Sequence, residues 1–375
     1  MPKIVEIIPA LAWGGAEIFC INLCNEFIKD ANNSVTLISM YDHNPDLLPV
    51  SLLDERIKLI TLGKKSGPHI KIIRKLFKTI NRIQPDIVHT HLHTGYYTLY
   101  SALKLRRSSV RFFHTFHNPV KKESPKWAMR RIYEIFFRTK IITPVSTTKE
   151  VLEGAKKEYG KNSATDLIHC NTIPLSATPE FENIKQKIAS LKKNIHTKVF
   201  LNVARIAKQK NQHLLLDCMK TLEEENENTI AVFIGNTTEK NAHLYKELLE
   251  AKPNNVHFLG RVSNVGDYLL NADALVLTSL YEALPIALQE AFSVGLIPIC
   301  TPVGGMLETI TEETGFLAKD TSHKEFVKTL KRFIQTDAKV LQQLKANGKK
   351  LFQKQLHIEI CASKYQELFS RKSMS

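Results

Sequence analysis

The stretch that decides the fold is residues 274–295, which read ALVLTSLYEALPIALQEAFSVG. Residues 274–277 are a short apolar run of the kind that forms a buried parallel strand. Pro285 suits the first position of a helix, where a missing N–H costs nothing, and Gly295 suits the position just after the helix ends. Residues 296–300 resume as a strand, so the helix N-terminus points out of the carboxyl edge of a sheet, where open α/β sheets bind ligands.

A helix N-terminus attracts anions, because its first N–H groups are free and its dipole is positive there. Two carboxylates, Glu282 and Glu290, flank this position with seven residues between them. The stretch therefore predicts a ligand site at which an anion and neutral hydroxyl groups could both be bound.

Length and composition indicate an ordinary two-domain globular protein. The chain has 375 residues, and a single hydrophobic core rarely grows beyond about 250–300 residues. Glu6 interrupts the short apolar run at the N-terminus, so this run reads as a strand and not as a secretory signal. No apolar run reaches the roughly 18 residues that a spanning helix needs, and we expect a cytoplasmic location. The six scattered cysteines form no Cys-x-x-Cys pair and are expected to be buried reduced thiols.

The net charge of +15 is unevenly distributed. Residues 64–140 contain 18 lysines and arginines against three acidic residues, so this window alone carries the whole net charge. A positive face of this kind suits an anionic membrane surface, a nucleic acid or a phosphorylated substrate. No nucleic-acid recognition motif is present, and we expect no nucleic-acid partner. Residues 127–138 predict a basic amphipathic helix, which either lies on a membrane surface or packs its apolar stripe on its own domain.

Two series of strands and helices follow one another along the chain. The first has strands near 3–8, 34–39, 57–60, 86–89, 110–116 and 141–146, and the second has strands from 199 and near 229–234, 256–259, 274–277 and 296–300. This alternation predicts an α/β protein with two Rossmann-like domains facing across a cleft. We place the domains at residues 1–178 and 179–355. An amphipathic helix within residues 356–375 is expected to cross back onto the first domain.

The first domain offers a glycine loop and several histidines. Gly14 and Gly15 follow the first strand, but the third glycine of a dinucleotide fingerprint is missing, so a nicotinamide cofactor is not supported and a simple tight turn is the alternative. At the end of the strand near 86–89, His89 and His91 alternate along the chain, and we expect them to point to opposite faces. With no carboxylate close in sequence, we predict no metal site there. His117 follows another strand end, on the expected ligand edge.

The second domain supplies the charges of the predicted site. Arg205 and Lys210 follow its first strand and therefore lie on the same sheet edge as the helix that starts at Pro285. Two cations beside a helix N-terminus suit a diphosphate, and they would stabilise a departing diphosphate. Glu290 could accept hydrogen bonds from both hydroxyls of a ribose, and Glu282 could act on other hydroxyls or as a general base. The alternative is that these four residues are surface charges without a role.

Several motifs in this order resemble the retaining glycosyltransferases of family 4, which have the GT-B fold. The resemblance covers about residues 3–320. The matching segments are Gly14-Gly15-Ala16-Glu17, Pro85-Asp86-Ile87-Val88-His89-Thr90-His91, His114-Thr115-Phe116-His117, Val145-Ser146, Val203-Ala204-Arg205 with Lys210, Phe258-Leu259-Gly260-Arg261-Val262, Glu282 with Glu290, and Pro302-Val303-Gly304-Gly305 with Glu308.

The resemblance implies a nucleotide-sugar donor, with a UDP-sugar expected, and transfer with retention and without a metal or other cofactor. It implies that His117 and Glu282 act on the donor sugar. The donor-binding residues that it implies are Gly15, Arg205, Lys210, Arg261, the amides of Ala283 and Leu284, and Glu290. The positive face leads us to expect a lipid-linked or cell-surface polysaccharide or lipopolysaccharide acceptor, and peripheral association with an anionic membrane.

The chain departs from the family pattern at a few positions. Ala283, Ala204 and Thr172 stand where glycine is usual, and Phe292-Ser293 replaces the usual Met-Ala. These changes exchange small residues or lie at the surface, so we expect activity to be retained, with Ala283 able to alter donor preference. A non-catalytic GT-B partner subunit of another transferase and a nucleotide-sugar epimerase are the alternative functions.

Overall fold

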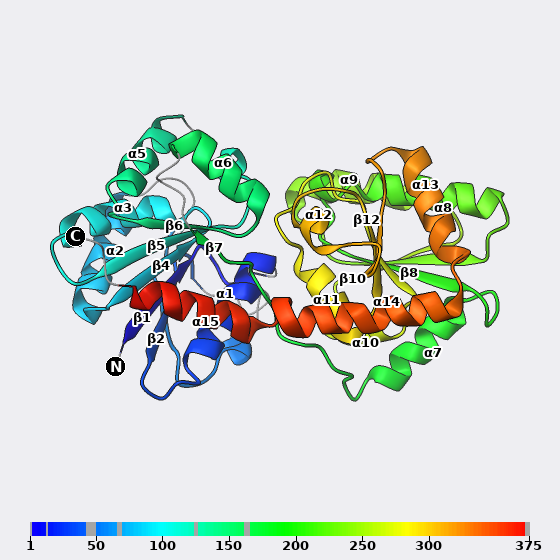
Figure 1. Cartoon of the computed structure of the whole chain (residues 1–375), viewed down its shortest axis with the longest axis horizontal. Helices are drawn as coiled ribbons and strands as arrows, with labels where there is room; N and C mark the ends of the chain where they lie inside the picture. Colours follow the sequence, from blue (N-terminus) through cyan, green and yellow to red (C-terminus); the bar gives the residue numbers. More distant parts are fainter. Residues whose placement is uncertain are drawn as a thin grey trace. The chain divides into compact units, whose positions relative to one another are not determined.

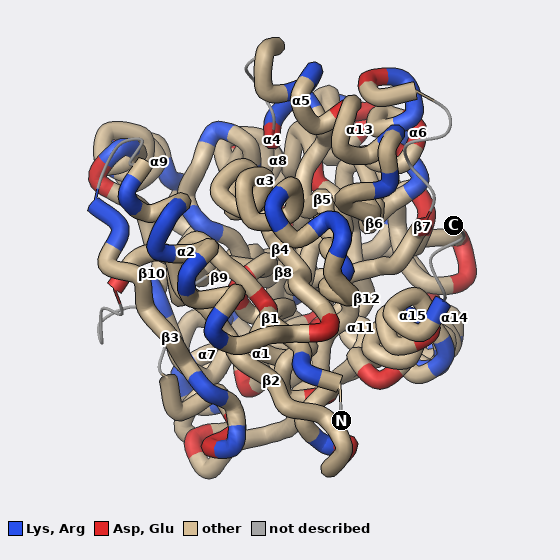
Figure 2. Tube along the Cα trace, turned by 90° about the vertical axis from the view of Figure 1, so that its left-hand side faces the viewer, with Lys and Arg blue, Asp and Glu red and all other residues tan. Residues whose placement is uncertain are grey.

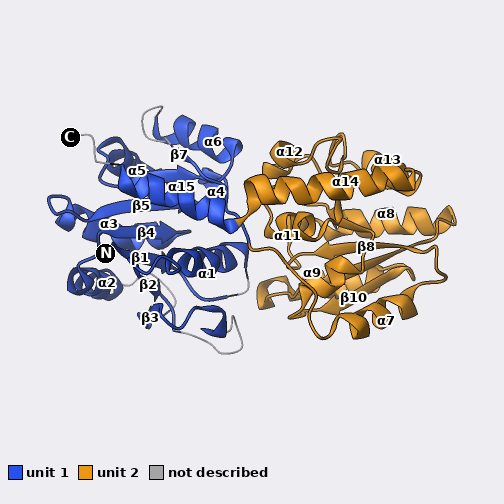
Figure 3. Ribbon diagram, turned by 60° about the horizontal axis from the view of Figure 1, so that its bottom comes forward, with its two compact units in different colours: residues 1–172, 358–375 blue, residues 173–357 orange. Residues whose placement is uncertain are grey.

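The computed structural model describes residues 2–12, 14–42, 50–65, 70–123, 127–160 and 166–371. Trp13 of the glycine loop and parts of the basic window, residues 66–69 and 124–126, lie outside the described residues. The chain divides into two compact units, residues 1–172 with 358–375 (unit 1) and residues 173–357 (unit 2) (Figure 3). The division after Thr172 comes before the boundary predicted at residue 178, and the last helix belongs to unit 1.

Unit 1 is built on a seven-stranded parallel sheet with strand order β3-β2-β1-β4-β5-β6-β7 (Figure 1). Its strands are β1 (Lys3–Ile8), β2 (Ser34–Ser39), β3 (Lys58–Thr61), β4 (Ile87–His91), β5 (Arg111–Phe116), β6 (Thr143–Ser146) and β7 (Asp166–Leu167). Its helices are α1 (Gly15–Phe27), α2 (Ile70–Ile83), α3 (Thr94–Leu105), α4 (Val120–Glu123), α5 (Trp127–Arg138), α6 (Lys149–Tyr159) and α15 (Ile358–Ser370).

Unit 2 repeats the architecture with a six-stranded parallel sheet of order β10-β9-β8-β11-β12-β13. Its strands are β8 (Lys198–Val203), β9 (Thr229–Ile234), β10 (Val256–Gly260), β11 (Ala274–Leu277), β12 (Ile297–Cys300) and β13 (Phe316–Leu317). Its helices are α7 (Phe181–Leu191), α8 (Gln212–Glu224), α9 (Ala242–Ala251), α10 (Val265–Leu270), α11 (Ile286–Val294), α12 (Gly305–Thr309), α13 (His323–Ile334) and α14 (Ala338–Leu351).

The order of the strands confirms the Rossmann-like reading of both halves. In each sheet the chain starts at a central strand, β1 or β8, runs to one edge, and then returns to build the other side. The carboxyl ends of parallel strands lie on one edge, and at the reversal of direction the loops after the two central strands diverge and leave room for a ligand. In unit 2 those loops follow β8 and β11, which are the loops that carry the predicted charges.

The C-terminal helix α15 completes the core of unit 1. It packs against α1, and Cys361 and Tyr365 are fully buried in the same cluster as Phe19. The Ile358 N–H donates to the Thr172 carbonyl at 2.9 Å, and the Arg111 guanidinium donates to the Leu368 carbonyl at 3.3 Å. These contacts fix the last helix to the first domain, as predicted.

The cysteines and the helices of the described residues bear on two further expectations. All six cysteines are buried, and all are free thiols, as predicted. Within the described ranges, no helix combines the length and the apolar character that crossing a bilayer requires.

Candidate functional site

The N-terminus of the helix predicted within residues 274–295 lies close to its expected position. Pro285 is the N-cap of α11, with φ −61° and ψ 131°, so the helix starts at Ile286, one residue later than predicted. Proline suits this place too, because its ring leaves the extended ψ available and its missing N–H removes no helical bond. Gly295 ends the helix in the left-handed conformation, with φ +76°, as predicted. The first amides of α11 have no partner within the helix, which leaves an anion-attracting end on the carboxyl edge of the sheet.

Lys210 and Glu282 form an ion pair beside this helix. The Lys210 ammonium contacts the Glu282 carboxylate directly, and their side chains are only 18% and 9% exposed. The Ser279 hydroxyl donates a second hydrogen bond to the same carboxylate at 2.7 Å. The two residues, which we predicted to serve diphosphate and sugar separately, are therefore joined, and each compensates the charge of the other.

Main-chain and side-chain hydrogen bonds hold the loop after β8 against the loop after β11. The Leu280 N–H donates to the Gln209 carbonyl at 2.8 Å, and the Gln209 side-chain amide donates to the Tyr281 carbonyl at 2.9 Å. The Thr278 hydroxyl donates to the Lys210 carbonyl at 3.0 Å. Segments some seventy residues apart in sequence thus form one frame, as the parallel sheet topology predicted.

Gly304 and Gly305, which follow β12, shape the segment between Glu282 and α11. Gly304 has a φ of +54°, and a Cβ there would lie 1.9 Å from the Glu282 carbonyl oxygen. The Gly305 N–H donates to the Ala283 carbonyl at 2.5 Å. Only glycine allows this approach of two backbones, so the glycine pair fixes where the amides of Ala283 and Leu284 lie.

The two arginines of the predicted site have exposed side chains on the same edge of unit 2. Arg205 follows β8, and its carbonyl accepts a hydrogen bond from the Gln212 side-chain amide at 2.8 Å. Gly235 is adjacent, and a Cβ there would lie 1.9 Å from the Ala204 carbonyl oxygen. Arg261 follows β10 and is also exposed. The backbone is therefore fixed at Arg205, while its guanidinium group can reach a ligand through solvent.

Glu290 lies in the second turn of α11, half-buried. Burial raises the pKa of its carboxyl group from 4.5 to about 7. A carboxylate removed from water in this way gains from any hydroxyl donors that a ligand brings to it. Glu290 is thus suited to recognise a diol, and its charge at neutral pH depends on whether the ligand is present.

The glycine loop of unit 1 leads directly into α1. Gly14 is the N-cap and Gly15 is the first helical residue. A Cβ on Gly14 would lie 2.3 Å from an oxygen of the Glu17 carboxylate, so this side chain lies over the loop. The acidic group thus lies at the end of α1 where the resemblance places Gly15 as a donor-binding residue.

The histidines of β4 do not point to opposite faces, and that prediction was wrong. Successive residues of a strand alternate between faces, so residues two apart share a face. His89 Nδ1 and His91 Nε2 both lie on the Glu6 carboxylate, at 3.0 and 2.7 Å from its Oε2. All three side chains are fully buried. Glu6, 83 residues before His89, is the companion carboxylate that the sequence did not place nearby.

His117 extends this cluster. Its Nε2 lies 2.9 Å from His91 Nδ1, and its Nδ1 lies 3.6 Å from Cys170 Sγ. Burial, followed by the neighbouring histidines, lowers the pKa of His117 well below 6.5, so the ring is neutral. Both ring nitrogens therefore contact protein side chains in this conformation. The contact of His117 with a donor sugar stays a prediction.

The same cluster contains a set of atoms that could hold a metal ion. One ligand atom from each of Glu6, His89 and His91 lies within 4.8 Å of the others. The donor types suit a transition metal. The distances between them are those of hydrogen bonds, however, and His89 Nε2 is also bonded, to Thr115 Oγ1 at 2.7 Å. Hydrogen bonds among these side chains account for the distances between them.

Glu123 is a residue of this region that the sequence did not reveal. Its Oε2 accepts hydrogen bonds from the amides of His117 at 3.1 Å and Asn118 at 3.4 Å. Burial raises the pKa of this carboxyl group to about 8. Glu123 thus holds the loop that carries His117 by its backbone, while the Glu6 cluster holds its ring.

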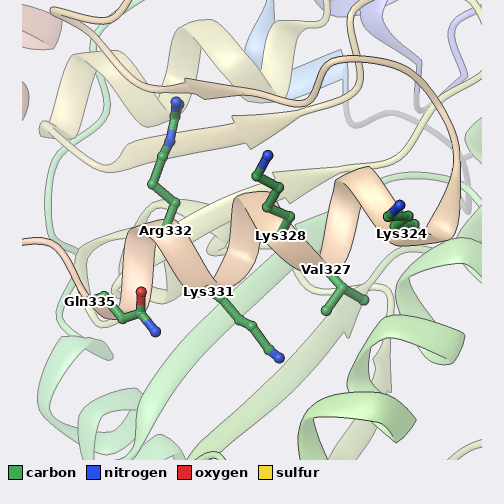
Figure 4. Close-up of a pocket in the computed structure, with 6 residues that line it drawn as sticks. All are labelled: Lys324, Val327, Lys328, Lys331, Arg332 and Gln335. Atoms are coloured by element: carbon green, nitrogen blue, oxygen red, sulfur yellow. The ribbon is translucent and has the colours of Figure 1, made fainter.

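A second basic surface, on α13, involves none of the predicted site residues. Figure 4 shows its side chains, which line a shallow hollow: Lys324, Val327, Lys328, Lys331, Arg332 and Gln335. Lys331 is paired with Glu225, and Arg332 with Glu312 at 3.4 Å. Two of the four cations that line the hollow thus have acidic partners, and we assign the hollow no function.

Comparison with known families identifies the class of this protein. The family "Glycosyltransferase Family 4" matches residues 13–170, and "Glycosyl transferases group 1" matches residues 183–351. The two matches together take in most of unit 1 and most of unit 2. The chain therefore belongs to the family 4 type of glycosyltransferase, a class of transferase enzymes, and its units are the two Rossmann-like domains of the GT-B fold.

Individual relatives are distant. An uncharacterized glycosyltransferase of Methanocaldococcus jannaschii is 25% identical over 66% of this chain, and the match spans 64% of that protein, just under two thirds. The Escherichia coli UDP-Gal:α-D-GlcNAc-diphosphoundecaprenol α-1,3-galactosyltransferase is 27% identical over 74% of this chain and 73% of its own length. The crystal structure of Anabaena Alr3699/HepE with UDP and glucose has a TM-score of 0.82 at 15% identity, covering 99% of this chain and 100% of that one. This last likeness concerns the fold.

Proposed function

We propose that the protein transfers a sugar from a UDP-sugar to a lipid-linked or cell-surface polysaccharide acceptor, with retention and without a metal. The observation that carries the proposal is the frame in unit 2, where the N-terminus of α11, the Lys210–Glu282 pair and Arg205 follow adjacent strand ends. The Anabaena protein was crystallised with UDP and glucose, and the E. coli relative is named for a UDP-Gal donor. Both support uridine as the base.

The donor would bind along the carboxyl edge of unit 2. The diphosphate would lie at the amides of Ala283 and Leu284, with Arg205 supplying a cation from solvent. Glu290 would accept the ribose hydroxyls. Binding of the diphosphate would draw Lys210 away from Glu282 or share it between the two anions, and this leaves Glu282 able to accept a sugar hydroxyl.

Departure of the diphosphate is the step that these groups would assist. Negative charge grows on the diphosphate as the bond to the sugar breaks, and fixed cations and amides lower the energy of that charge. No Asp-x-Asp motif occurs in the sequence, so we assign the charge stabilisation to Arg205, Lys210 and the α11 amides. Retention and the roles of His117 and Gly15 toward the donor are proposed from the family resemblance.

The acceptor proposal rests on the relatives and on the charge of unit 1. The E. coli relative is named for a sugar carried on diphosphoundecaprenol, and a Bacillus subtilis relative is a putative teichuronic acid biosynthesis glycosyltransferase. Figure 2 shows lysines and arginines along α2 and around α3 and α5 of unit 1. A positive surface of this kind suits a diphosphate-linked lipid and the anionic membrane that holds it.

Helix α5 is the element that we propose contacts the membrane. Its inner face buries Tyr133 and Phe137, so the helix packs on its own domain as one of the two alternatives expected. Its outer face nevertheless carries Trp127 and Ile135, 73% and 59% exposed, in one stripe with Arg131, which lies four residues from each. Aromatic and apolar groups among arginines are the composition of an interfacial helix.

The test of the transfer proposal is sugar transfer by the purified protein from UDP-sugars to polyprenyl-diphosphate acceptors. We expect Glu290→Ala and Arg205→Ala to lose most of the turnover, while Lys208→Ala, an exposed cation in the same loop, keeps it. Unchanged turnover in both of the first two variants would refute the assignment. UDP binding without transfer to any acceptor would favour a non-catalytic subunit, and conversion of the donor without an acceptor would favour an epimerase.

The membrane proposal has a separate test in vesicle co-sedimentation. Binding to vesicles with anionic lipid should fall as salt rises, and Trp127→Ala with Ile135→Ser should weaken it without changing turnover on a water-soluble acceptor. The matched control is Leu249→Ser on α9, a single exposed apolar side chain in unit 2. Equal binding by the α5 variant and this control would refute the role of α5.

A further inference from the structure

The charge of the Glu6 carboxylate determines which atom donates and which accepts in each hydrogen bond from Glu6 to His91 and His117. The Glu6 carboxylate is held in its charged form: burial raises its pKa, but the attraction of His89 and the hydrogen bonds from both histidines outweigh this and lower it to about 2. A charged carboxylate only accepts hydrogen bonds. The nitrogen that faces it at 2.7 Å, His91 Nε2, must therefore carry a proton.

The proton on His91 Nε2 decides the state of His117. Burial lowers the pKa of His91 to about 4, so its ring is neutral and holds one proton. Its Nδ1 then has a lone pair, and His117 Nε2, 2.9 Å away, must be the donor. His117 is neutral as well, so its Nδ1 has a lone pair that faces the Cys170 thiol. Burial raises the pKa of this thiol well above 9.0, which keeps its proton available to donate.

Packing holds the two rings in this arrangement. The Phe19 ring meets both His91 and His117 edge-on, with centroids 6.0 and 5.7 Å away. Glu123 holds the main chain of His117. A buried ring held on these sides cannot turn over and exchange the positions of its two nitrogens without breaking its hydrogen bonds. Because the site is buried, bonds to water cannot replace them.

We propose that Glu6 is a positioning residue which, through His91, holds His117 as the neutral tautomer protonated on Nε2. Its effect on sugar transfer rests on the proposed function, in which His117 acts on the donor. The same carboxylate also binds His89, which bonds through Thr115 to Tyr365 of α15 at 2.7 Å. The hydrogen bonds through His89, Thr115 and Tyr365 do not include His117, so a substitution at Tyr365 serves as a control.

The experiment is NMR of the full chain labelled with 15N-histidine, which distinguishes protonated from bare ring nitrogens. We expect His91 and His117 to carry their protons on Nε2. Glu6→Gln keeps an acceptor oxygen for His91 and should preserve this state. Glu6→Met is similar in size but has no acceptor, so His117 should change to a mixture or to the Nδ1 form. Tyr365→Phe should leave His117 unchanged.

Several results would overturn the proposal. One is a wild-type spectrum with the His117 proton on Nδ1, and this remains decisive if Glu6→Met does not fold. Another is an unaltered His117 in a folded Glu6→Met variant. A third is stoichiometric binding of added Zn²⁺ by His89 and His91, because the cluster would then be a metal site.

Activity measurements separate this proposal from the proposed function. Glu6→Met should lower kcat at least about tenfold, as expected when a reacting group is misplaced, with UDP affinity unchanged and Glu6→Gln restoring the rate. A changed tautomer with an unchanged kcat would overturn the positioning role. A wild-type protein without transfer activity would refute the proposed function and leave the tautomer result standing.

Discussion

Glu290 should make the binding of a UDP-sugar depend on pH. Burial raises the pKa of its carboxyl group to about 7 in the free protein, while acceptance of two ribose hydroxyls requires the ionised form. The ligand therefore has to displace a proton below this pH. A UDP-sugar is the suitable probe, because its diphosphate, esterified at both ends, has no group that titrates near neutrality.

The expected size of the effect follows from that pKa. About a tenth of the Glu290 side chains are ionised at pH 6 and about nine tenths at pH 8, so affinity should rise about tenfold over this range, which corresponds to about 1.4 kcal/mol. Calorimetry in two buffers of different ionisation enthalpy should also detect proton release on binding at pH 6 and almost none at pH 8.

The matched variant is Glu290→Gln, which keeps one acceptor oxygen and cannot ionise. Its affinity should be nearly the same at pH 6 and pH 8. A wild-type affinity that does not change with pH would refute the assignment of the ribose to Glu290. A Glu290→Gln protein with the full wild-type pH dependence would refute it as well, because the titrating group would then lie elsewhere.

Three further outcomes can be measured on the purified protein. Lys210→Ala leaves the mostly buried Glu282 carboxylate without its cation and should lower the free energy of unfolding in urea by about 3 kcal/mol, whereas the exposed Lys208→Ala should be near neutral. Gly304→Ala places a Cβ 1.9 Å from the Glu282 carbonyl oxygen at a left-handed φ. UDP binding, as measured by the thermal shift that UDP causes, should therefore be lost. Glu123 has its folded pKa raised to about 8 by burial. Stability should therefore fall as pH rises from about 4.5 to about 8, by at most about 1.4 kcal/mol per pH unit, and urea unfolding of Glu123→Gln should lack this fall.

Much of the fold could be predicted because local pattern and global topology agree. Apolar runs such as residues 274–277 and 229–234 are the observed β11 and β9, and Gly295 ends α11 where its left-handed conformation was expected. Periodicity does not fix a boundary that depends on a single cap, and the N-terminus of α11 lies one residue later than predicted. The two-residue strand β7 is too short to leave a pattern in the sequence.

Spacing could predict which side chains share a sheet edge, but it could not predict how they pair. Spacing placed Lys210 and Glu282 on one sheet edge, since the ends of parallel strands meet there. Sequence spacing could not show that their charges compensate each other, because this depends on the distance between the two side-chain ends in the folded protein. The prediction for the histidines of β4 was wrong for another reason. Residues two apart in a strand share a face, so the sequence alone places His89 and His91 on the same side of the sheet.

The sequence by itself determined the family, the two parallel sheets and the residues at their carboxyl edges, because these follow from periodicity and from motifs carried by contiguous segments. Only the tertiary structure decided which partners those residues have. Glu6 meets His91 through the pairing of β1 with β4, and Tyr365 meets Thr115 across 250 residues. Hydrogen bonds and burial act over a few ångströms in space, and positions far apart in the chain acquire that proximity only when the sheet forms.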